Sequence, residues 1–311
     1  MSKVTVVGAG NVGAACAYAL VQQCVDEIAM VDIIEGVAEG KAMDLRQGRS
    51  ALGSDSQVVG STGYDISADS DIVVITAGAP RKPGMSRDDL VEINVKIVSA
   101  VTKEVVARSP NAILIIVSNP LDAMVYTAAE VSKFPRQRVF GMAGVLDSAR
   151  MRSNIAEKLR IGIEDISAIV LGGHGDTMIP LPRLCSVGGV PIECLMSKED
   201  IHEVIEKTRN GGGAFLPLLK TSAWIAPGLS AAEMVDSILK NRRRVLPCCA
   251  YLNGEYGQRD IPVGVPVILG RTGIEQVIEI PFTHEEKANF DTTVRHVLEL
   301  IAVAKRFLAP Q

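Results

Sequence analysis

The length, composition and charge of the chain exclude several classes of protein. With 311 residues, 47% hydrophobic and 22% charged, it can form one large or two moderate globular domains and shows no sign of disorder. The net charge of −4 gives no general attraction to nucleic acid or to an anionic membrane, and no apolar run reaches transmembrane length. The N-terminus lacks the features of a signal peptide, so we expect a cytoplasmic protein.

The cysteines and histidines indicate neither a disulfide scaffold nor a metal site. The six cysteines show no C-x-x-C spacing and are too sparse for a small disulfide-rich fold. We interpret them as small apolar residues. The four histidines do not cluster with them, so we expect no bound metal.

The first half of the chain alternates short strands with helices. Strands are predicted at 3–8, 27–32, 71–78 and 112–120, and helices at 11–23, 37–48 and about 88–108. The last two strands are continuous apolar runs, which is typical of strands covered on both faces. This order predicts an α/β fold with a doubly wound parallel sheet.

After about residue 144 the pattern changes. Predicted helices at 145–160, 198–210, 230–241 and 284–308 are mixed with β segments such as 267–280, which glycine and proline interrupt. We therefore expect a second, α+β domain with antiparallel strands. No flexible linker separates the halves, so the predicted domains, 1–143 and 144–311, should pack tightly.

The stretch "VVGAGNVG" carries the first chemical motif. Gly8, Gly10 and Gly13 form G-x-G-x-x-G directly after a predicted strand and open a helix, as in dinucleotide-binding folds. Asp32 ends the second strand, 19 residues after Gly13. A carboxylate there can accept hydrogen bonds from the ribose hydroxyls and would repel a 2′-phosphate. The motif therefore predicts NAD rather than NADP.

Two later motifs add an acid–base pair and a cation. Asp147 and Arg150 are three residues apart on one predicted helix face, a spacing also common in exposed ion pairs. His174 stands in the glycine-rich "LGGHGDTMIP" and can exchange a proton near neutral pH. A dinucleotide that gives hydride, a histidine that gives a proton and an arginine that holds a carboxylate are the parts needed to reduce a keto acid.

The loop "APRKPGMSR" concentrates positive charge in a slightly acidic chain. Arg81 and Arg87 lie six residues apart, with Lys82 and a Pro-Gly pair between them. Either this is a solvated surface loop or it meets a ligand that carries two negative charges. The run "RRR" at 242–244 is interpreted as a solvated helix end.

Taken together, the motifs resemble those of the lactate/malate dehydrogenase superfamily, and closely those of its bacterial, lactate-dehydrogenase-like malate dehydrogenases. The resemblance runs over the whole chain, through "VITAGAPRKPGMSRDDL", "IIVSNPLD", "GVLDSAR" and "LGGHGDTMIP". It implies an NAD-dependent malate dehydrogenase of the tricarboxylic acid cycle that acts on a small dicarboxylate, malate or oxaloacetate. It also implies an NAD-binding Rossmann domain over 1–143, a substrate domain over 144–311, and a homo-oligomer, a tetramer or a dimer.

The resemblance assigns a role to each motif residue. His174 would be the catalytic proton donor and acceptor, and Asp147 would orient it. Arg150 would bind the C1 carboxylate of the substrate. Arg87 would close over the substrate from a mobile loop, and Arg81 stands at the specificity position, where it can pair with the distal carboxylate.

The cofactor contacts also follow from the resemblance. Asn119 of "VSNP" would contact both the substrate carbonyl and the nicotinamide ribose, and the peptide bond between Asn119 and Pro120 would be cis. The implied cofactor-binding residues are Gly8, Ala9, Gly10, Asn11, Val12, Gly13, Asp32, Asn94, Val117, Ser118 and Asn119.

Three alternatives stay open. A lactate or other 2-hydroxyacid dehydrogenase is disfavoured mainly by Arg81. An NAD-dependent glycosidase has a related two-domain architecture, but "VSNP" lacks the metal-binding cysteine expected at that motif. A non-catalytic dinucleotide-binding protein would have no need for His174, Asp147, Arg150 and Arg87 together.

Overall fold

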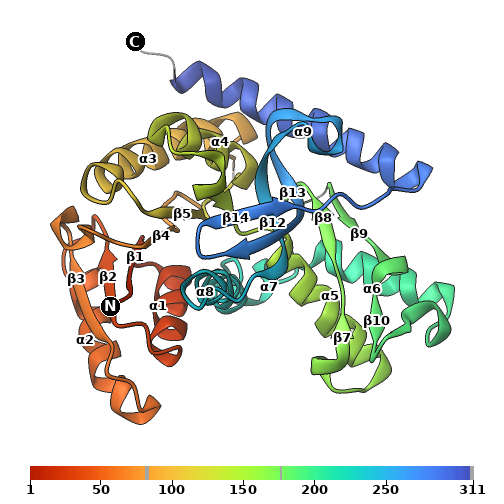
Figure 1. The fold of residues 1–311 in the computed structure, drawn as a ribbon, viewed down its shortest axis with the longest axis horizontal. Helices are drawn as coiled ribbons and strands as arrows, with labels where there is room; N and C mark the ends of the chain where they lie inside the picture. The colour runs from red at the N-terminus through yellow and green to blue at the C-terminus, as the bar shows by residue number, and fades with distance from the viewer. Residues whose placement is uncertain (81–83, 176, 309–311) are drawn as a thin grey trace.

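The computed structural model describes residues 1–80, 84–175 and 177–308 (Figure 1). The predicted specificity residue Arg81 lies outside these ranges. The first half of the chain contains six parallel strands in the described ranges. They are β1 Lys3–Val7, β2 Glu27–Val31, β3 Gln57–Ser61, β4 Ile72–Ile75, β5 Ile113–Ile116 and β6 Val139–Gly141. They lie in the order β3-β2-β1-β4-β5-β6, which is the order of a dinucleotide-binding fold.

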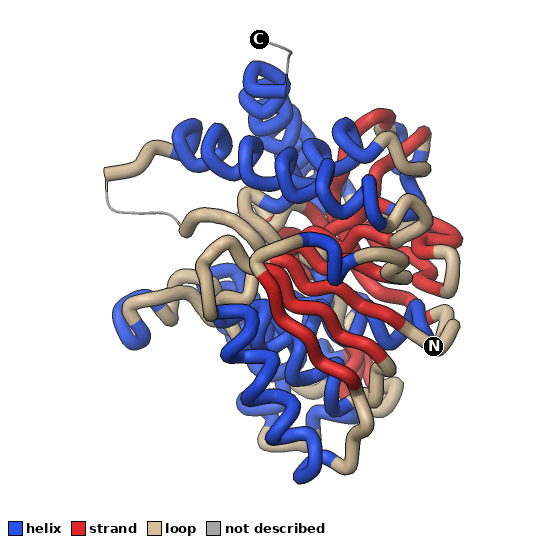
Figure 2. The backbone as a smooth tube through the Cα atoms, turned by 90° about the vertical axis from the view of Figure 1, so that its left-hand side faces the viewer, coloured by secondary structure: helices blue, strands red, loops and turns tan. Residues whose placement is uncertain are grey.

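Helices cover both faces of these strands. They are α1 Asn11–Gln22, α2 Val37–Gly48, α3 Arg87–Arg108 and α4 Leu121–Ser132. In Figure 1 α3 and α4 lie above the parallel strands and α1 and α2 below them, and Figure 2 shows helices on both sides of the strands. Burial on both faces explains why β4 and β5 are continuous apolar runs.

The second half supplies the remaining elements. They are α5 Gly144–Leu159, β7 Ile166–Ser167, β8 Val170–Gly172, β9 Met178–Pro180, β10 Ser186–Val187, β11 Val190–Pro191, α6 Lys198–Asn210, α7 Leu216–Leu219, α8 Ile225–Leu239, β12 Arg244–Asn253, β13 Arg259–Gly270, β14 Gly273–Val277 and α9 His284–Leu308. The expected antiparallel strands are present: β13 pairs antiparallel with β12 on one side and with β14 on the other. The predicted fold class is thereby confirmed.

One sheet runs through both halves of the chain. Antiparallel β12 joins parallel β6 where Cys249 pairs with Gly141, and β13, β8 and β9 continue the sheet. In the described part this sheet has 11 strands, and β7, β10 and β11 form a separate sheet of three. A continuous hydrophobic core, which includes Phe140 and Phe290, also spans the two halves. The halves are thus held together by backbone pairing and by packing.

Several elements differ from the sequence prediction, which did not include strands β3 and β6. The predicted strand at 112–120 ends at Ile116, and an unpredicted helix, α4, begins at Leu121. Pro120 cannot donate to a sheet but suits the position just before a helix, where its nitrogen needs no partner. Helix α8 begins at Ile225 rather than 230, and Pro227 lies in its first turn, where proline is tolerated.

The ends of the parallel strands bring the predicted motifs to one edge. Strand β1 ends at Val7, before the glycine-rich loop, and β2 ends at Val31, before Asp32. Strand β4 ends at Ile75, before the arginine-bearing loop, and β5 ends at Ile116, before "VSNP". In open α/β sheets ligands bind at this carboxyl edge. No helix within the described ranges is long and apolar enough to cross a membrane.

Candidate active site

The glycine-rich loop between β1 and α1 is tightly packed except at Gly10. Gly8 has a φ of +98°, which other residues rarely adopt, and a Cβ there would lie 2.7 Å from the backbone nitrogen of Ala77. A Cβ at Gly13 would lie 1.9 Å from the carbonyl oxygen of Gly8, whereas one at Gly10 would meet nothing within 4 Å. Gly8 and Gly13 therefore serve the packing, and Gly10 leaves open space before α1.

That open space is bordered by groups that suit a dinucleotide. The N-terminus of α1 has no side-chain cap at Gly10, so its backbone N–H groups present partial positive charge, as a pyrophosphate requires. Asp32 Oδ2 accepts a hydrogen bond from the Ala9 amide at 2.7 Å, and Oδ1 accepts one from Ile34 at 3.0 Å. The carboxylate is thus fixed beside the loop, where it can meet a ribose.

Lys41 is a neighbour of the loop that the sequence analysis missed. Its Nζ donates a hydrogen bond to the carbonyl oxygen of Ala9 at 2.6 Å, from the face of α2 that meets the loop. Nothing local marks this lysine, because helix spacing alone does not tell which loop a helix face covers. It contributes a fixed positive charge at the glycine-rich loop.

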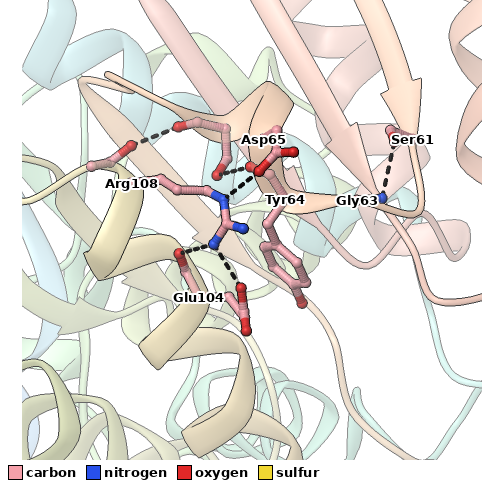
Figure 3. Close-up of polar contacts among 8 residues, drawn as sticks. Ser61, Gly63, Tyr64, Asp65, Glu104 and Arg108 are labelled. Carbon is pink, nitrogen blue, oxygen red and sulfur yellow. Dashed lines mark hydrogen bonds and ion pairs between the residues drawn. The ribbon is translucent and has the colours of Figure 1, made fainter.

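A second polar cluster fixes the turn after β3, as Figure 3 shows. Near the end of α3, Arg108 donates to Asp65 Oδ1 at 3.0 Å and to Glu104 Oε2 at 2.6 Å. Tyr64 lies in the same turn, and its pKa is raised by burial and by the carboxylates of Glu104 and Asp32. The phenol therefore stays neutral near the Asp32 carboxylate.

Asn94 joins two of the predicted loops. This side chain of α3 is 1% exposed, and its Nδ2 donates to the carbonyl oxygens of Asn119 at 2.6 Å and Ala79 at 3.1 Å. Its Oδ1 accepts from the Ala79 amide at 2.7 Å. Asn94 therefore fixes the start of the arginine-bearing loop against the backbone of "VSNP".

The "VSNP" motif lies at the end of β5. Val117 is buried, and Ser118 Oγ donates to the carbonyl oxygen of Ala77 at 2.6 Å. Asn119 is exposed at the carboxyl edge. The peptide bond between Asn119 and Pro120 is cis, which confirms that prediction.

His174 and Asp147 meet from two separate elements. His174 is in the loop between β8 and β9, and Asp147 is in the first turn of α5. Nδ1 of His174 lies 3.0 Å from Oδ2 of Asp147, and the side chains are 16% and 2% exposed. With Nδ1–H donating to the carboxylate, Nε2 is the ring nitrogen that can exchange a proton with a ligand.

The charges around His174 raise its pKa above the ordinary value. Burial alone lowers it, but the charge and the hydrogen bond of Asp147 outweigh burial. The charge of Arg150 lowers this pKa, and the charge of Asp122 raises it. The arrangement therefore favours the imidazolium form, which can act as an acid near neutral pH.

Arg150 completes this cluster. Its Nη1 donates to Asp147 Oδ1 at 2.9 Å, and the arginine side chain is 16% exposed. The i, i+3 spacing on α5 places both side chains on one helix face, as predicted, and the Asp147 carboxylate contacts both Arg150 and His174. Next to it, a Cβ added at Gly211 would lie 3.1 Å from Cδ of Arg150.

Arg87 points elsewhere in this structure. It is exposed at the start of α3, and its Nη1 lies 3.3 Å from Nδ1 of His296 on α9, with a second contact between Nη2 and Nε2 of that ring. The guanidinium is thus paired with α9 and not with the cluster of His174, Asp147 and Arg150.

Asp122 is a further acidic residue that the sequence analysis did not select. It is 3% exposed at the start of α4, and its Oδ2 would lie 3.6 Å from a Cβ added at Gly173. Because Asp122 follows Asn119 by three residues, this contact brings "VSNP" close to the loop of His174. The only local signal was an acidic residue in a first helical turn, which more often serves the helix dipole.

A cavity of about 910 Å³ lies at the opposite edge of the sheet. Ser2, Asp71 and Arg138 are among its lining residues, and none of the predicted site residues in the described ranges lines it. Elsewhere in the described chain, no group of three or more His, Cys, Asp or Glu side chains is arranged to hold a metal ion.

Comparison with known proteins identifies the family. The profile of the lactate/malate dehydrogenase NAD binding domain matches residues 2–141, and that of the lactate/malate dehydrogenase alpha/beta C-terminal domain matches residues 144–308. The chain belongs to the lactate/malate dehydrogenase family. This confirms the predicted resemblance, the NAD-dependent oxidoreductase class and the cofactor.

Individual relatives align over nearly the full chain. The malate dehydrogenase of Cytophaga hutchinsonii is 52% identical over 303 residues, which cover 97% of each chain. The solved malate dehydrogenase of Salinibacter ruber has a TM-score of 0.94 at 48% identity and 98% coverage of each chain. A lactate dehydrogenase of Cryptosporidium parvum, complexed with lactic acid and β-nicotinamide adenine dinucleotide, has a TM-score of 0.93 at 37% identity and 99% coverage of each chain. Both activities share this fold, so side chains must decide the substrate.

Proposed function

We propose that this protein is an NAD-dependent malate dehydrogenase that interconverts (S)-malate and oxaloacetate, the reaction of the tricarboxylic acid cycle. The observation that carries the proposal is the cluster of His174, Asp147 and Arg150, which combines a proton donor, its orienting carboxylate and a carboxylate-binding cation. Curated relatives of about half-identical sequence that bear the malate dehydrogenase name support the choice of substrate.

The cofactor fits the first half of the chain. Bound NADH supplies the hydride that reduces the carbonyl carbon of oxaloacetate. The proposed cofactor-binding residues are Gly8, Ala9, Gly10, Asn11, Val12, Gly13, Asp32, Asn94, Val117, Ser118 and Asn119. Residues 1–143 are the proposed NAD-binding domain, and residues 144–311 the substrate domain.

His174 moves the proton. In oxaloacetate reduction the imidazolium gives a proton from Nε2 to the carbonyl oxygen, and in malate oxidation the neutral ring takes it back. Asp147 holds Nδ1–H, which fixes the tautomer and stabilises the imidazolium through the 3.0 Å contact.

Three arginines bind the dicarboxylate. Arg150 holds the C1 carboxylate, since a guanidinium can donate two parallel hydrogen bonds to it. Arg87 must leave His296 as the loop closes, and then polarises the carbonyl oxygen. Arg81 pairs with the second carboxylate and so selects oxaloacetate over pyruvate.

We also propose a cytoplasmic homo-oligomer, a tetramer or a dimer. Exposed apolar side chains on the cofactor half and on α8, such as Tyr18, Met43 and Leu229, support association. All six cysteines are free, which suits a reducing compartment. Light scattering of the purified protein measures the assembly.

A comparison of two substrates tests the function. NADH absorbance is followed with oxaloacetate and with pyruvate, and oxaloacetate should give the higher kcat/KM by roughly 30-fold to several-thousand-fold, the effect of leaving a buried charge without its partner. A preference for pyruvate would make the protein a lactate-type dehydrogenase. Failure to oxidise NADH with either substrate would overturn the proposal.

A further inference from the structure

A buried carboxylate from the cofactor half reaches the loop that carries His174. Asp122 lies in the first turn of α4 and is 3% exposed. Its Oδ2 would lie 3.6 Å from a Cβ built on Gly173, the residue before His174. A carboxylate in such a place is unfavourable unless it is hydrogen-bonded or paired with a positive charge.

The partners of Asp122 come from other elements. Cys249 Sγ, on β12, donates a hydrogen bond to Asp122 Oδ1 at 3.2 Å. Burial, and then the charge of Asp122, raise the pKa of the Cys249 thiol well above its ordinary value, so the thiol keeps the proton that it donates. On its other side, Asp122 Oδ2 lies against Gly173, the residue before His174.

Asp122 and His174 therefore influence each other's charge. Burial raises the pKa of Asp122 to about 6, while the Cys249 thiol and the His174 ring act in the opposite direction. The charged groups that act most strongly on His174 are Asp147 and Arg150 from α5 and Asp122 from α4. Asp147 holds the ring at Nδ1, and Asp122 lies against Gly173 in the same loop.

We propose that Asp122 is a positioning residue for proton transfer: its carboxylate, fixed by the Cys249 thiol, supports the His174 loop at Gly173 and stabilises the imidazolium. The proposal deepens the function proposed above and rests on it for the kinetic effect. Asp122 touches neither substrate nor cofactor in this role, because it acts through His174.

A purely structural role is the competing explanation. A carboxylate in the first turn of a helix stabilises that helix through its dipole, and Asp122 is in the first turn of α4. That role would affect the stability of α4 but not the proton affinity of a histidine on another loop. Titration of His174 therefore separates the two explanations.

The direct test is an NMR titration of the imidazoles in the purified protein, without substrate. His174 is assigned by its loss in His174→Asn, and wild type is compared with Asp122→Asn, which keeps the size of the side chain. The proton affinity of His174 should fall severalfold in Asp122→Asn. An unchanged titration in a folded Asp122→Asn protein would overturn the proposal.

Variants of β12 provide a second, milder test. Cys249→Ala removes the thiol donor and should lower the proton affinity of His174 in the same direction but less, whereas Cys249→Ser, which keeps a donor, should restore it. Cys248→Ala is the matched control, because this buried neighbour points to the other face of β12. Equal effects of Cys248→Ala and Cys249→Ala would contradict the role of the thiol.

Kinetics then connect the inference to catalysis. Asp122→Asn should lower kcat for oxaloacetate reduction about tenfold or more, with NADH affinity preserved, because small misplacements of a catalytic group are costly. If wild type does not reduce oxaloacetate, the proposed function fails, while the NMR titration still decides the coupling of Asp122 to His174. If wild type is active and Asp122→Asn has the same kcat and pH profile as wild type, the positioning role of Asp122 is wrong while the proposed function stands.

Discussion

Gly211, just beyond the end of α6, packs directly against the side chain of Arg150 on α5. A Cβ at Gly211 would lie 3.1 Å from Cδ of Arg150 and 3.2 Å from the carbonyl oxygen of Thr208. Both distances are shorter than ordinary van der Waals contacts, so the glycine leaves the room that the arginine occupies. Gly211 thus helps to set the direction of Arg150, the proposed ligand of the substrate carboxylate.

A larger side chain at this position should displace Arg150. Gly211→Val is expected to raise KM for oxaloacetate roughly tenfold, since part of a charge-assisted hydrogen bond is lost. Affinity for NADH, measured by fluorescence, should not change. Gly213→Val is the control, because a Cβ there meets only a carbonyl oxygen at 3.8 Å. Similar KM values for the two variants would rule out this role of Gly211.

Removal of the imidazole should stop proton transfer without loss of the cofactor. His174→Asn is expected to lower kcat by roughly 10²–10⁴-fold while NADH still binds. Asp147→Asn should also slow the reaction, because the amide no longer fixes the tautomer or stabilises the imidazolium. Near wild-type turnover in His174→Asn would remove this histidine from the mechanism.

The raised pKa of His174 predicts opposite pH dependence for the two directions. Oxaloacetate reduction needs the imidazolium, so its kcat/KM should persist above the ordinary histidine pKa and fall as pH rises through the raised value. Malate oxidation needs the neutral ring, so its kcat/KM should rise over the same interval. Steady-state profiles in both directions provide the measurement, and parallel profiles would contradict the assignment.

The raised pKa of His174 should also make the free energy of unfolding depend on pH. Because the pKa of His174 is raised on folding, the pair with Asp147 contributes its full stabilisation below the ordinary histidine pKa. This contribution is lost as pH rises through the folded-state value. Urea unfolding of wild type and His174→Asn should therefore differ most at low pH and converge at high pH. A constant difference across this range would speak against linkage through His174.

Asp32 should make the protein strongly selective for NADH over NADPH. Its carboxylate is fixed at Ala9 and Ile34, so a 2′-phosphate would meet a negative charge that cannot easily move away. Asp32→Ser should lower the ratio of kcat/KM for NADH to kcat/KM for NADPH, mainly because kcat/KM for NADPH rises. Comparable kcat/KM values for NADH and NADPH in wild type would refute the assignment.

Arg81 should decide between a dicarboxylate and a monocarboxylate. Arg81→Gln is expected to lower kcat/KM for oxaloacetate sharply, by about 2–5 kcal/mol of transition-state stabilisation, and to raise it for pyruvate. Lys82→Gln, one residue along the loop, should change neither substantially. Equal losses for both substrates in Arg81→Gln would mean that this arginine supports loop closure in general.

Local patterns in the sequence determined much of the fold and part of the site. The apolar runs at β4 and β5 and the boundaries of α2 follow from side-chain periodicity and glycine placement, which act over a few residues. The glycine-rich loop and the Asp147–Arg150 pair are likewise local, because their geometry depends on one turn or one helix face.

Only the tertiary structure decided which of these local features meet. Asp147 and His174 are 27 positions apart, and Asp122 and Cys249 are 127 positions apart. These side chains meet because β12 is a strand of the shared sheet and α5 packs against that sheet. Neither separation has a periodic signature in the sequence. The contact of Arg87 with α9, 209 positions away, is of the same kind. Such contacts depend on how whole elements bury their apolar faces against one another, and residue spacing does not encode this directly.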